Sequence, residues 1–399
     1  MRKQFFTILL LAMSVSLFSQ DNEQFLHDFE LKLGGEYRYF FEEGQFEGQV
    51  RNFPSISITP KYSLEWNKGY EQLNFTGFFR LDRDSNRTHW DIRELYYTKA
   101  KGNWELNVGL KKIFWGVTES NHLVDIVNQT DQVETFDGEQ KLGQGMVQFS
   151  LITDRIGTFD FIYLPHHRKR VFPGQKGRLR FANIIDGDAI DFENDNGQWY
   201  PGLALRWSHY FGIVDLGISQ YFGNGREPLF LFQEDGPPAI FYPEIYQSGI
   251  DIQLTHNAFL WKLESIYRYA VDQEFWAITG GLEYTFSNID GNGLDIGLLS
   301  EYTYDSRNEL ALTGLQNDLF VGSRIAFNGI NDGSILIGTI VDLEHGSNII
   351  SLETSRRFGE LITVEMEARI FNSIDPSEII LSNFGNDSFM RLSISTYLF

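Results

Sequence analysis

Residues 93–131 read RELYYTKAKGNWELNVGLKKIFWGVTESNHLVDIVNQTD, and this stretch decides the fold. Apolar and polar side chains alternate over residues 93–100 and again over residues 103–112, which predicts two strands. The dipeptide Lys101-Gly102 forms a tight turn between them. After the second strand, Trp115-Gly116 opens into a long loop. The stretch is a hairpin with a two-residue turn at one end and a long loop at the other, and the rest of the chain repeats this pattern.

Almost every segment from residue 28 onward alternates in the same way and is bounded by Gly, Asn or Asp. About 18 strands are predicted, with 16 as the alternative, because bacterial barrels have even strand numbers. The expected strands are 28–40, 54–66, 70–82, 88–100, 103–113, 144–153, 157–164, 199–209, 213–222, 243–254, 258–270, 273–286, 293–304, 317–327, 333–343, 347–357, 360–371 and 387–399.

The connections between these strands are sorted by length. Every second connection is short, and the long ones all fall in the other phase of the alternation: 41–53, 114–143, 165–198, 223–242, 305–316 and 372–386. Long loops therefore emerge at one end, as the outer loops of a transmembrane barrel do, while short turns face the periplasm. A soluble sandwich or propeller, the alternative, has no reason to sort its loops. We expect an all-β fold: a single antiparallel transmembrane β-barrel.

The two faces of each strand support a membrane barrel. In 360–371, Ile362, Val364 and Met366 alternate with Glu365 and Glu367. The polar face is charged on strand after strand, which suits a water-filled lumen, and the apolar face suits lipid.

The N-terminus predicts export. Charged residues at Arg2 and Lys3 precede an apolar run too short for a membrane helix, so residues 1–20 are expected to be a signal peptide, cut after Ser19 or Gln20, and residues 21–399 the barrel. The chain has no Cys, which excludes a lipoprotein and a disulfide framework. No plug domain is expected, because the first strand begins soon after the cleavage site. These features predict the outer membrane of a Gram-negative cell.

Charge and the C-terminus bear on partners. Without Arg2 and Lys3 the chain keeps 54 acidic and 31 basic residues, a net charge of −23 that argues against nucleic acid. The expected partners are outer-membrane lipid, lipopolysaccharide and small polar solutes. The final strand ends in Phe399, which looks like the signal read by the barrel-assembly machinery.

Three motifs in and around the hairpin at residues 93–112 resemble those of a known group. They are Arg93-Glu94-Leu95-Tyr96, the Trp115-Gly116 pair that ends the second strand, and Asp125-Ile126-Val127-Asn128-Gln129-Thr130-Asp131. The chain resembles Gram-negative outer-membrane barrels with R-E-x-Y, W-G and D-x-x-N-x-x-D motifs, which are distantly similar to alginate-export porins. It departs from them at Leu110-Lys111 and at Gln129, where Pro is common. The resemblance implies a channel-like barrel of unknown substrate.

Two hypotheses address the loop after Trp115. Trp115 is either an interfacial aromatic residue beside a Gly that lets the chain turn, or the start of a loop that folds into the lumen. In the second case, Asp125, Asn128 and Asp131 would be held by wall cations such as Arg93. An inward loop would narrow the pore.

The loop 165–198 contains the most basic segment, with Arg168, Lys169 and Arg170 at its start. It either lines a constriction that attracts anions, or binds lipopolysaccharide phosphates at the rim, or is simply solvated. A calcium site in this loop is a further alternative, with oxygen ligands from Asp186, Asp188, Asp191, Glu193 and Asp195.

The alternation of side chains along each strand places further charged residues in the lumen. Either they create a field across the pore that orients solutes, or they form cross-strand ion pairs. The first half of the barrel contributes Arg80, Arg93, Lys111 and Arg206, and the second half contributes Glu264, Arg268, Glu283, Glu301, Arg324, Glu353, Arg357, Glu365, Glu367 and Arg369.

These observations favour a porin that lets small polar or charged solutes diffuse through a lumen narrowed by inward loops. The alternatives are a non-conducting structural or assembly barrel and a rim-active hydrolase. The hydrolase is disfavoured because no Gly-x-Ser-x-Gly or His-x-x-Glu-His motif is present. We expect no enzyme activity, cofactor, catalytic residue or resident metal. The oligomeric state stays open.

Overall fold

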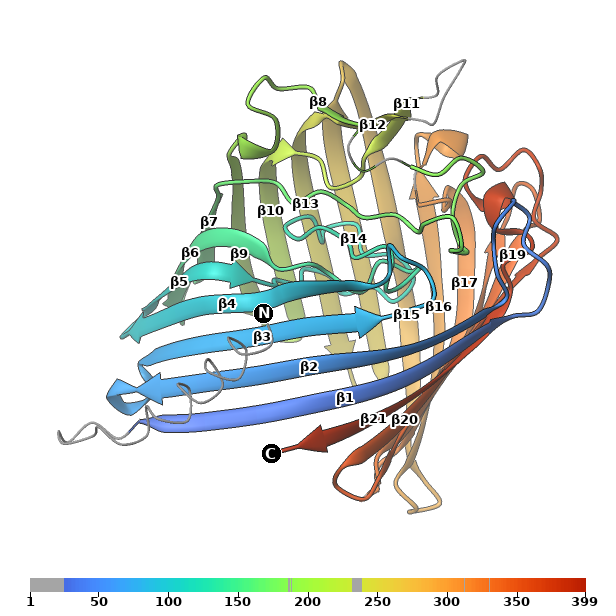
Figure 1. Ribbon diagram of the computed structural model, residues 1–399. Helices are drawn as coiled ribbons and strands as arrows, with labels where there is room; N and C mark the ends of the chain where they lie inside the picture. The colour runs from blue at the N-terminus through green and yellow to red at the C-terminus, as the bar shows by residue number, and fades with distance from the viewer. Residues whose placement is uncertain (1–24, 186, 188, 232–238, 312, 330) are drawn as a thin grey trace, which may run out of the picture.

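The computed structural model describes residues 25–185, 187, 189–231, 239–311, 313–329 and 331–399, so the expected signal peptide lies outside the described residues. The described chain is an all-β closed barrel (Figure 1). Its wall is formed by β1 (Leu26–Phe40), β2 (Asn52–Trp66), β3 (Glu71–Leu81), β4 (His89–Lys101), β5 (Trp104–Lys111), β6 (Gln144–Thr153), β7 (Gly157–Leu164), β9 (Gly202–Phe211), β10 (Val214–Asn224), β13 (Glu244–His256), β14 (Phe259–Ala270), β15 (Gln273–Ile289), β16 (Leu294–Asp305), β17 (Asn317–Phe327), β18 (Gly333–Asp342), β19 (Asn348–Phe358), β20 (Ile362–Asn372) and β21 (Phe389–Leu398).

The wall is one 18-stranded sheet in which each strand pairs antiparallel with the next along the chain. β1 pairs with both β2 and β21, which closes the ring and leaves no open edge. The predicted fold and strand number are confirmed, and every predicted strand end lies within three residues of the observed one. Among the described residues, no helix is long and apolar enough to cross a membrane.

Side-chain alternation gives the wall two different faces. On β16, Leu298 and Tyr302 point outward and are 50% and 41% exposed, whereas Glu301 and Thr303 point inward and are buried. The outward face of the barrel is rich in exposed apolar and aromatic side chains, which lipid can cover and water cannot favourably solvate.

The long connections lie at one end, and part of them forms a second, small sheet. It consists of β8 (Ile190–Phe192), β12 (Ala239–Tyr242) and β11 (Leu229–Leu231), where β12 is parallel to β8 and antiparallel to β11 (Figure 1). These short strands lie within predicted loops and were not expected. Short 3₁₀ turns are formed by 67–69, 197–199, 308–310 and 381–384.

Apolar cores lie inside the ring and at its long-loop end. One cluster joins Trp115, Val124 and Val127 of the loop after β5 to inward residues of β6, β7, β9, β10 and β13–β15. A second cluster joins Phe40, Phe389 and their neighbours at the ends of β1 and β21. The interior is therefore packed with side chains.

Tight packing of strands at Gly281 provides a test of this wall. A Cβ at Gly281 of β15 would lie 2.0 Å from Ser300 O and 2.6 Å from Glu301 Cα, both of which belong to the backbone of β16. We expect Gly281→Ala to lower the free energy of unfolding by about 1–3 kcal/mol, as overpacking does. The measurement is the denaturant midpoint of the purified barrel in detergent. Gly35→Ala is the control, because a Cβ there meets nothing within 4 Å; equal midpoints for both variants would contradict the packing.

Candidate functional site

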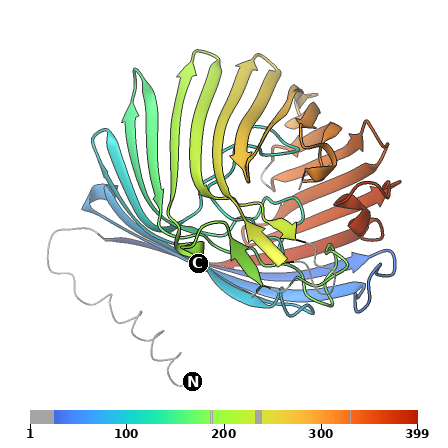
Figure 2. The ribbon, with the colours of Figure 1, turned by 90° about the horizontal axis from the view of Figure 1, so that it is seen from above.

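The lumen is occupied by residues 112–143, which connect β5 to β6 and are called here the lumen loop (Figure 2). Asn128 fastens the two ends of this loop together. Its Oδ1 accepts a hydrogen bond from Ile113 N at 2.9 Å, and its Nδ2 donates to Lys111 O and Leu142 O, both at 2.9 Å. The loop is thus closed into a compact unit before it meets the wall.

Asp125 has a similar internal role. Its Oδ1 accepts a hydrogen bond from Trp115 N at 3.2 Å, and its Oδ2 lies 3.1 Å from Lys141 Nζ. The expectation that Asp125 and Asn128 bind wall cations is therefore wrong. Both partners of Asp125 belong to the lumen loop. The backbone partners of Asn128 belong to the lumen loop or to the end of β5. Their side chains are short, and the polar backbone groups of the loop ends are closer to them than the wall is.

Asp131 does bind the wall. Its carboxylate lies 2.5 Å from Arg93 Nη2 on β4, the contact expected for an inward loop. Three residues further on, Glu134 Oε2 lies 2.8 Å from Arg80 Nη2 on β3. Burial opposes ionisation of Glu134, yet Arg80 and Arg87 together lower its pKa. These pairs attach one side of the lumen loop to β3 and β4.

Glu264 of β14 attaches the opposite side and is fully buried. Its Oε1 accepts hydrogen bonds from Val117 N at 2.7 Å, from Thr118 N at 3.0 Å and from Thr118 Oγ1 at 2.7 Å, while its Oε2 accepts from Val124 N at 3.1 Å. One carboxylate therefore satisfies four donors of the lumen loop.

Glu301 of β16 repeats this arrangement. Its carboxylate accepts hydrogen bonds from Glu119 N, from Ser120 N and from the Ser120 hydroxyl, at 2.7–2.9 Å. The side chain of Glu119 then pairs with Arg324 Nη2 of β17 at 2.5 Å. Since Asp137 also lies 2.7 Å from Arg369 of β20, the lumen loop is bound to the wall on several sides.

Trp115 lies in the interior. It is 5% exposed, packs in the cluster with Val124 and Val127, and its ring lies 5.3 Å from the Arg206 guanidinium. The interfacial alternative for Trp115 is wrong, because the side chain is buried among inward residues of the wall and does not face lipid.

Residues 165–185 cross the long-loop end and are called here the crossing loop. Arg168 pairs with Asp91 of β4 at 2.8 Å, near the start of the loop. Arg178 pairs with Asp387, just before β21, at 2.6 Å. Gly174 N donates to Asp84 Oδ2 at 2.7 Å between these points. The crossing loop thus reaches from β7 to the region around β21 and β1.

Gln129 joins the two loops, a role that the sequence did not indicate. Its side chain is fully buried, its Oε1 accepts a hydrogen bond from Arg170 Nε at 3.1 Å, and its Nε2 donates to Arg168 O at 3.3 Å. Lys169, between these two arginines, is exposed. A Pro at position 129 could make neither side-chain bond.

Most of the remaining predicted residues have a polar partner in the wall or in a connection beside it. Arg206 forms a two-pronged pair with Asp251, which supports the ion-pair alternative over a transverse field. The other contacts are Lys111 with Gln148 at 3.1 Å, Glu283 with Lys262 at 3.8 Å, Arg268 with Glu227 at 2.7 Å, Arg369 with Glu353 at 2.6 Å and with Glu367 at 3.2 Å, and Arg357 with Asp332 at 3.1 Å, while Glu365 of β20 lies opposite Ser355 and Ser393.

A cavity of about 300 Å³ remains between the two loops and the wall. Phe136, Phe172, Phe181, Phe230 and Phe384 line it, together with several arginines. A pocket with apolar walls and a few convergent polar groups is the usual form of a ligand site.

Three of these arginines lack an acidic partner. Arg170 donates to Gln129 Oε1 and Arg226 O, Arg226 donates to Val127 O and His167 Nδ1, and Arg180 donates to backbone carbonyls. Within the part of the chain that the structure describes, none of the three forms an ion pair. The neighbouring acid Glu227 is already held by Arg268 at 2.7 Å and by Arg307 at 3.5 Å. The cavity therefore has a positively charged side, and buried charges of this kind call for a counter-charge.

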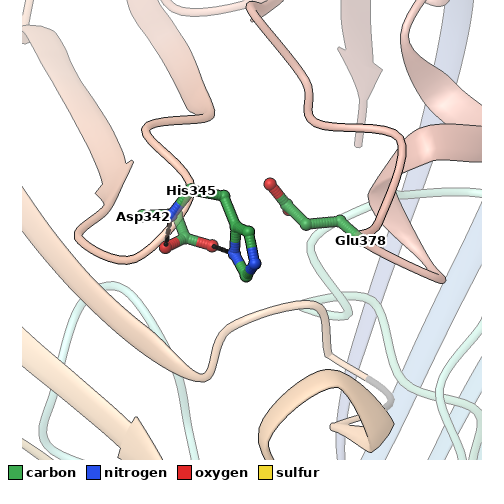
Figure 3. Close-up of side chains that lie close together, drawn as sticks. All are labelled: Asp342, His345 and Glu378. Carbon is green, nitrogen blue, oxygen red and sulfur yellow. Dashed lines mark hydrogen bonds and ion pairs between the residues drawn. The ribbon is translucent and has the colours of Figure 1, made fainter.

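The sequence also did not indicate a cluster formed by Asp342, His345 and Glu378, whose ligand atoms lie within 4.8 Å of one another (Figure 3). Asp342-x-x-His345 is visible as a short motif, but Glu378 comes from a different loop. The calcium alternative in the loop 165–198 rests partly on Asp186 and Asp188, which lie outside the described residues.

A closed antiparallel barrel with an apolar outer face and a charged inner face has the architecture of an outer-membrane β-barrel protein. No protein-family model matches the sequence, and neither does any curated protein. Among solved structures, Wzi of Escherichia coli, described as an outer-membrane carbohydrate-binding β-barrel involved in group 1 capsule assembly, has a TM-score of 0.54 and 11% identity, covering 92% of this chain and 84% of Wzi. A Rh. blastica porin variant has a TM-score of 0.45 and 10% identity, covering 94% of this chain and all of the porin. The Wzi similarity supports the fold, and the expected likeness to alginate-export porins stays a prediction.

The role of Glu264 can be tested by Glu264→Gln. The amide would keep one acceptor oxygen and point an N–H group at the Val124 amide, and the negative charge would be lost. Hydrogen bonds to charged groups contribute about 1.5–3 kcal/mol, so we expect the amides of Val117, Thr118 and Val124 to exchange hydrogen about 10-fold faster or more. Hydrogen exchange read by mass spectrometry measures this. Glu365→Gln, on the same face of the wall, should leave these amides unchanged; equal exchange in Glu264→Gln would contradict the anchoring role.

The stability of the crossing loop should depend on pH through His167. Burial, followed by the charge of Arg226, holds the pKa of His167 well below its ordinary value. As the pH falls below about 6.5, this imidazole takes up a proton in the unfolded chain before it does so in the folded protein. The folded state therefore loses stability on acidification. We expect His167→Asn, which keeps an acceptor for Arg226, to flatten the fall in melting temperature between pH 7 and pH 5. Parallel curves for the two proteins would contradict this assignment, and His256→Asn, at an exposed position, is the control.

Proposed function

We propose that this protein is a non-conducting outer-membrane barrel that binds a negatively charged saccharide at its long-loop end. Closure is supported by the lumen loop, which is fixed to β4 through Asp131, to β14 through Glu264, to β16 through Glu301 and to β20 through Asp137. A loop bound on these sides occupies the cross-section that a diffusing solute would use.

The cavity supports binding. Its phenylalanine rings provide apolar surface for the C–H faces of sugar rings, and Arg170, Arg180 and Arg226 provide donors without acidic partners. Guanidinium groups suit carboxylate and phosphate, which they bind through paired hydrogen bonds. The fold similarity to Wzi, described as carbohydrate-binding, agrees with a saccharide ligand.

Planar-bilayer recordings test whether the lumen loop closes the pore. We expect the purified full-length protein to show no steady open conductance. Lys111 pairs with Gln144, so a short Gly-Ser linker can replace residues 114–141 without stretching the wall, and we expect this variant to conduct. Steady conductance of the unaltered protein would contradict closure and would favour the porin alternative.

Calorimetric titration tests the ligand class. We expect oligogalacturonate, a chain of acidic sugars, to bind more tightly than a neutral dextran oligomer of similar length. Arg180→Gln should weaken binding by about 10-fold or more, because it removes a charged donor from the cavity. Arg83→Gln is the matched control: Arg83 is exposed, also donates to a backbone carbonyl, and lies outside the cavity. Equal binding of acidic and neutral oligomers would overturn the anionic assignment.

A further inference from the structure

Asp342, His345 and Glu378 meet at the long-loop end, on the side of β18 to β21 (Figure 3). Asp342 is the last residue of β18, His345 lies in the turn that leads to β19, and Glu378 lies in the connection between β20 and β21. Figure 3 shows the Glu378 side chain extending from its own loop toward the His345 ring. Two chain segments separated by one strand pair thus present ligand atoms to one point.

The three side chains are held in place by their surroundings. Asp342 Oδ1 accepts hydrogen bonds from Glu344 N at 2.6 Å and from His345 N at 3.0 Å, and its Oδ2 lies 3.2 Å from His345 Nδ1. The Ser347 hydroxyl donates to Glu378 and accepts from Asp375 N at 2.8 Å. Ligands that are already oriented lose little freedom when an ion binds.

The cluster carries an excess of negative charge in a buried place. Asp342 and Glu378 are 3% and 4% exposed, and Asp318, also 3% exposed, lies close enough to both of them to add to the repulsion. Burial raises the pKa of Glu378, and the charge of Asp342 adds to this effect. Across the described residues, no Lys or Arg forms an ion pair with any of these three carboxylates; the one basic side chain paired with the group is His345, beside Asp342. Buried carboxylates elsewhere in the barrel are satisfied in other ways: Asp387 has a basic partner in Arg178, and Glu301 accepts hydrogen bonds from the amides of the lumen loop.

The donor set selects the kind of ion. One imidazole and two carboxylates suit zinc, whereas calcium takes six to eight oxygen ligands and rarely nitrogen. A ligating histidine usually donates its other N–H group to a carboxylate, which fixes the ring. With Nδ1 facing Asp342, His345 Nε2 faces Glu309 Oε1 at 3.4 Å, which supplies that second partner.

We propose that Asp342, His345 and Glu378 bind a divalent transition-metal ion of the zinc type. The ion ties the β18–β19 turn to the β20–β21 connection and neutralises the buried carboxylates. The same connection contributes Leu381 and Phe384 to the cavity wall, so the ion steadies one side of the cavity without contacting its ligand. This inference does not depend on what the cavity binds.

A zinc titration tests the site. The full-length protein in detergent is first stripped of metal with a chelator and then dialysed. Competition with a chromophoric zinc indicator is expected to show one bound Zn²⁺ per chain, and saturation is expected to raise the melting temperature. His345→Ala and Glu378→Gln should each weaken zinc binding about 100-fold or more. His256→Ala and Glu344→Gln are the controls, since the first removes an exposed histidine and the second removes an adjacent acid outside the trio.

Three outcomes would overturn the proposal. They are the absence of one-to-one zinc binding, zinc binding that persists in both variants, and a preference for Ca²⁺ that His345→Ala leaves unchanged, which would indicate a site made of oxygen ligands alone. Heat-modifiable mobility in gel electrophoresis shows that each variant is a folded barrel, so loss of binding cannot come from misfolding. Zinc binding and melting temperature are read without any saccharide, so this test and that of ligand binding fail separately.

Discussion

The hydrogen bonds between Glu264 and the lumen loop are the interaction on which the interior depends. A loop that enters a barrel buries backbone N–H groups that strands would otherwise have satisfied, and each unsatisfied group costs free energy. Glu264 meets this need from the wall, with one fully buried carboxylate for four donors. The donors in turn stabilise a charge that could not remain ionised in the interior alone. Neither partner could occupy its place without the other.

The need to satisfy the lumen loop gives the inward-facing charged side chains a different role from the one that strand alternation alone suggests. Parity places Arg93 and Glu264 on a polar face, and polar faces in porins line water. Here Arg93 faces Asp131, and Glu264 faces backbone amides. A wall whose charges are largely paired, with a loop or with one another, has little field left to act on a passing solute. The same charges therefore support a filled lumen as readily as an open one, and only their partners distinguish the two.

The strands were predictable because the two-residue period is local. Each inward residue is set by its own pleat, so the wall could be predicted from short segments, as the ends of all 18 strands indicate. The loop contacts were not predictable, because they join distant residues: Val117 and Glu264 are 147 positions apart, and Arg178 and Asp387 are 209 apart. No periodicity connects such positions. The inward course of the loop was one of two hypotheses, and Trp115 could not decide between them, since a tryptophan serves a membrane interface and a buried core equally well.

The two loops also explain why the cavity lies where it does. The lumen loop is fixed from the wall through Glu264 and Glu301, and the crossing loop is fixed near its start through Arg168 and further along through Arg178. Gln129 then joins the two, so their spacing is set by side chains that do not line the cavity. In the proposed function, Arg170 and Arg226 would meet the anion in this cavity already oriented by their neutral partners, so that little side-chain freedom would be lost on binding.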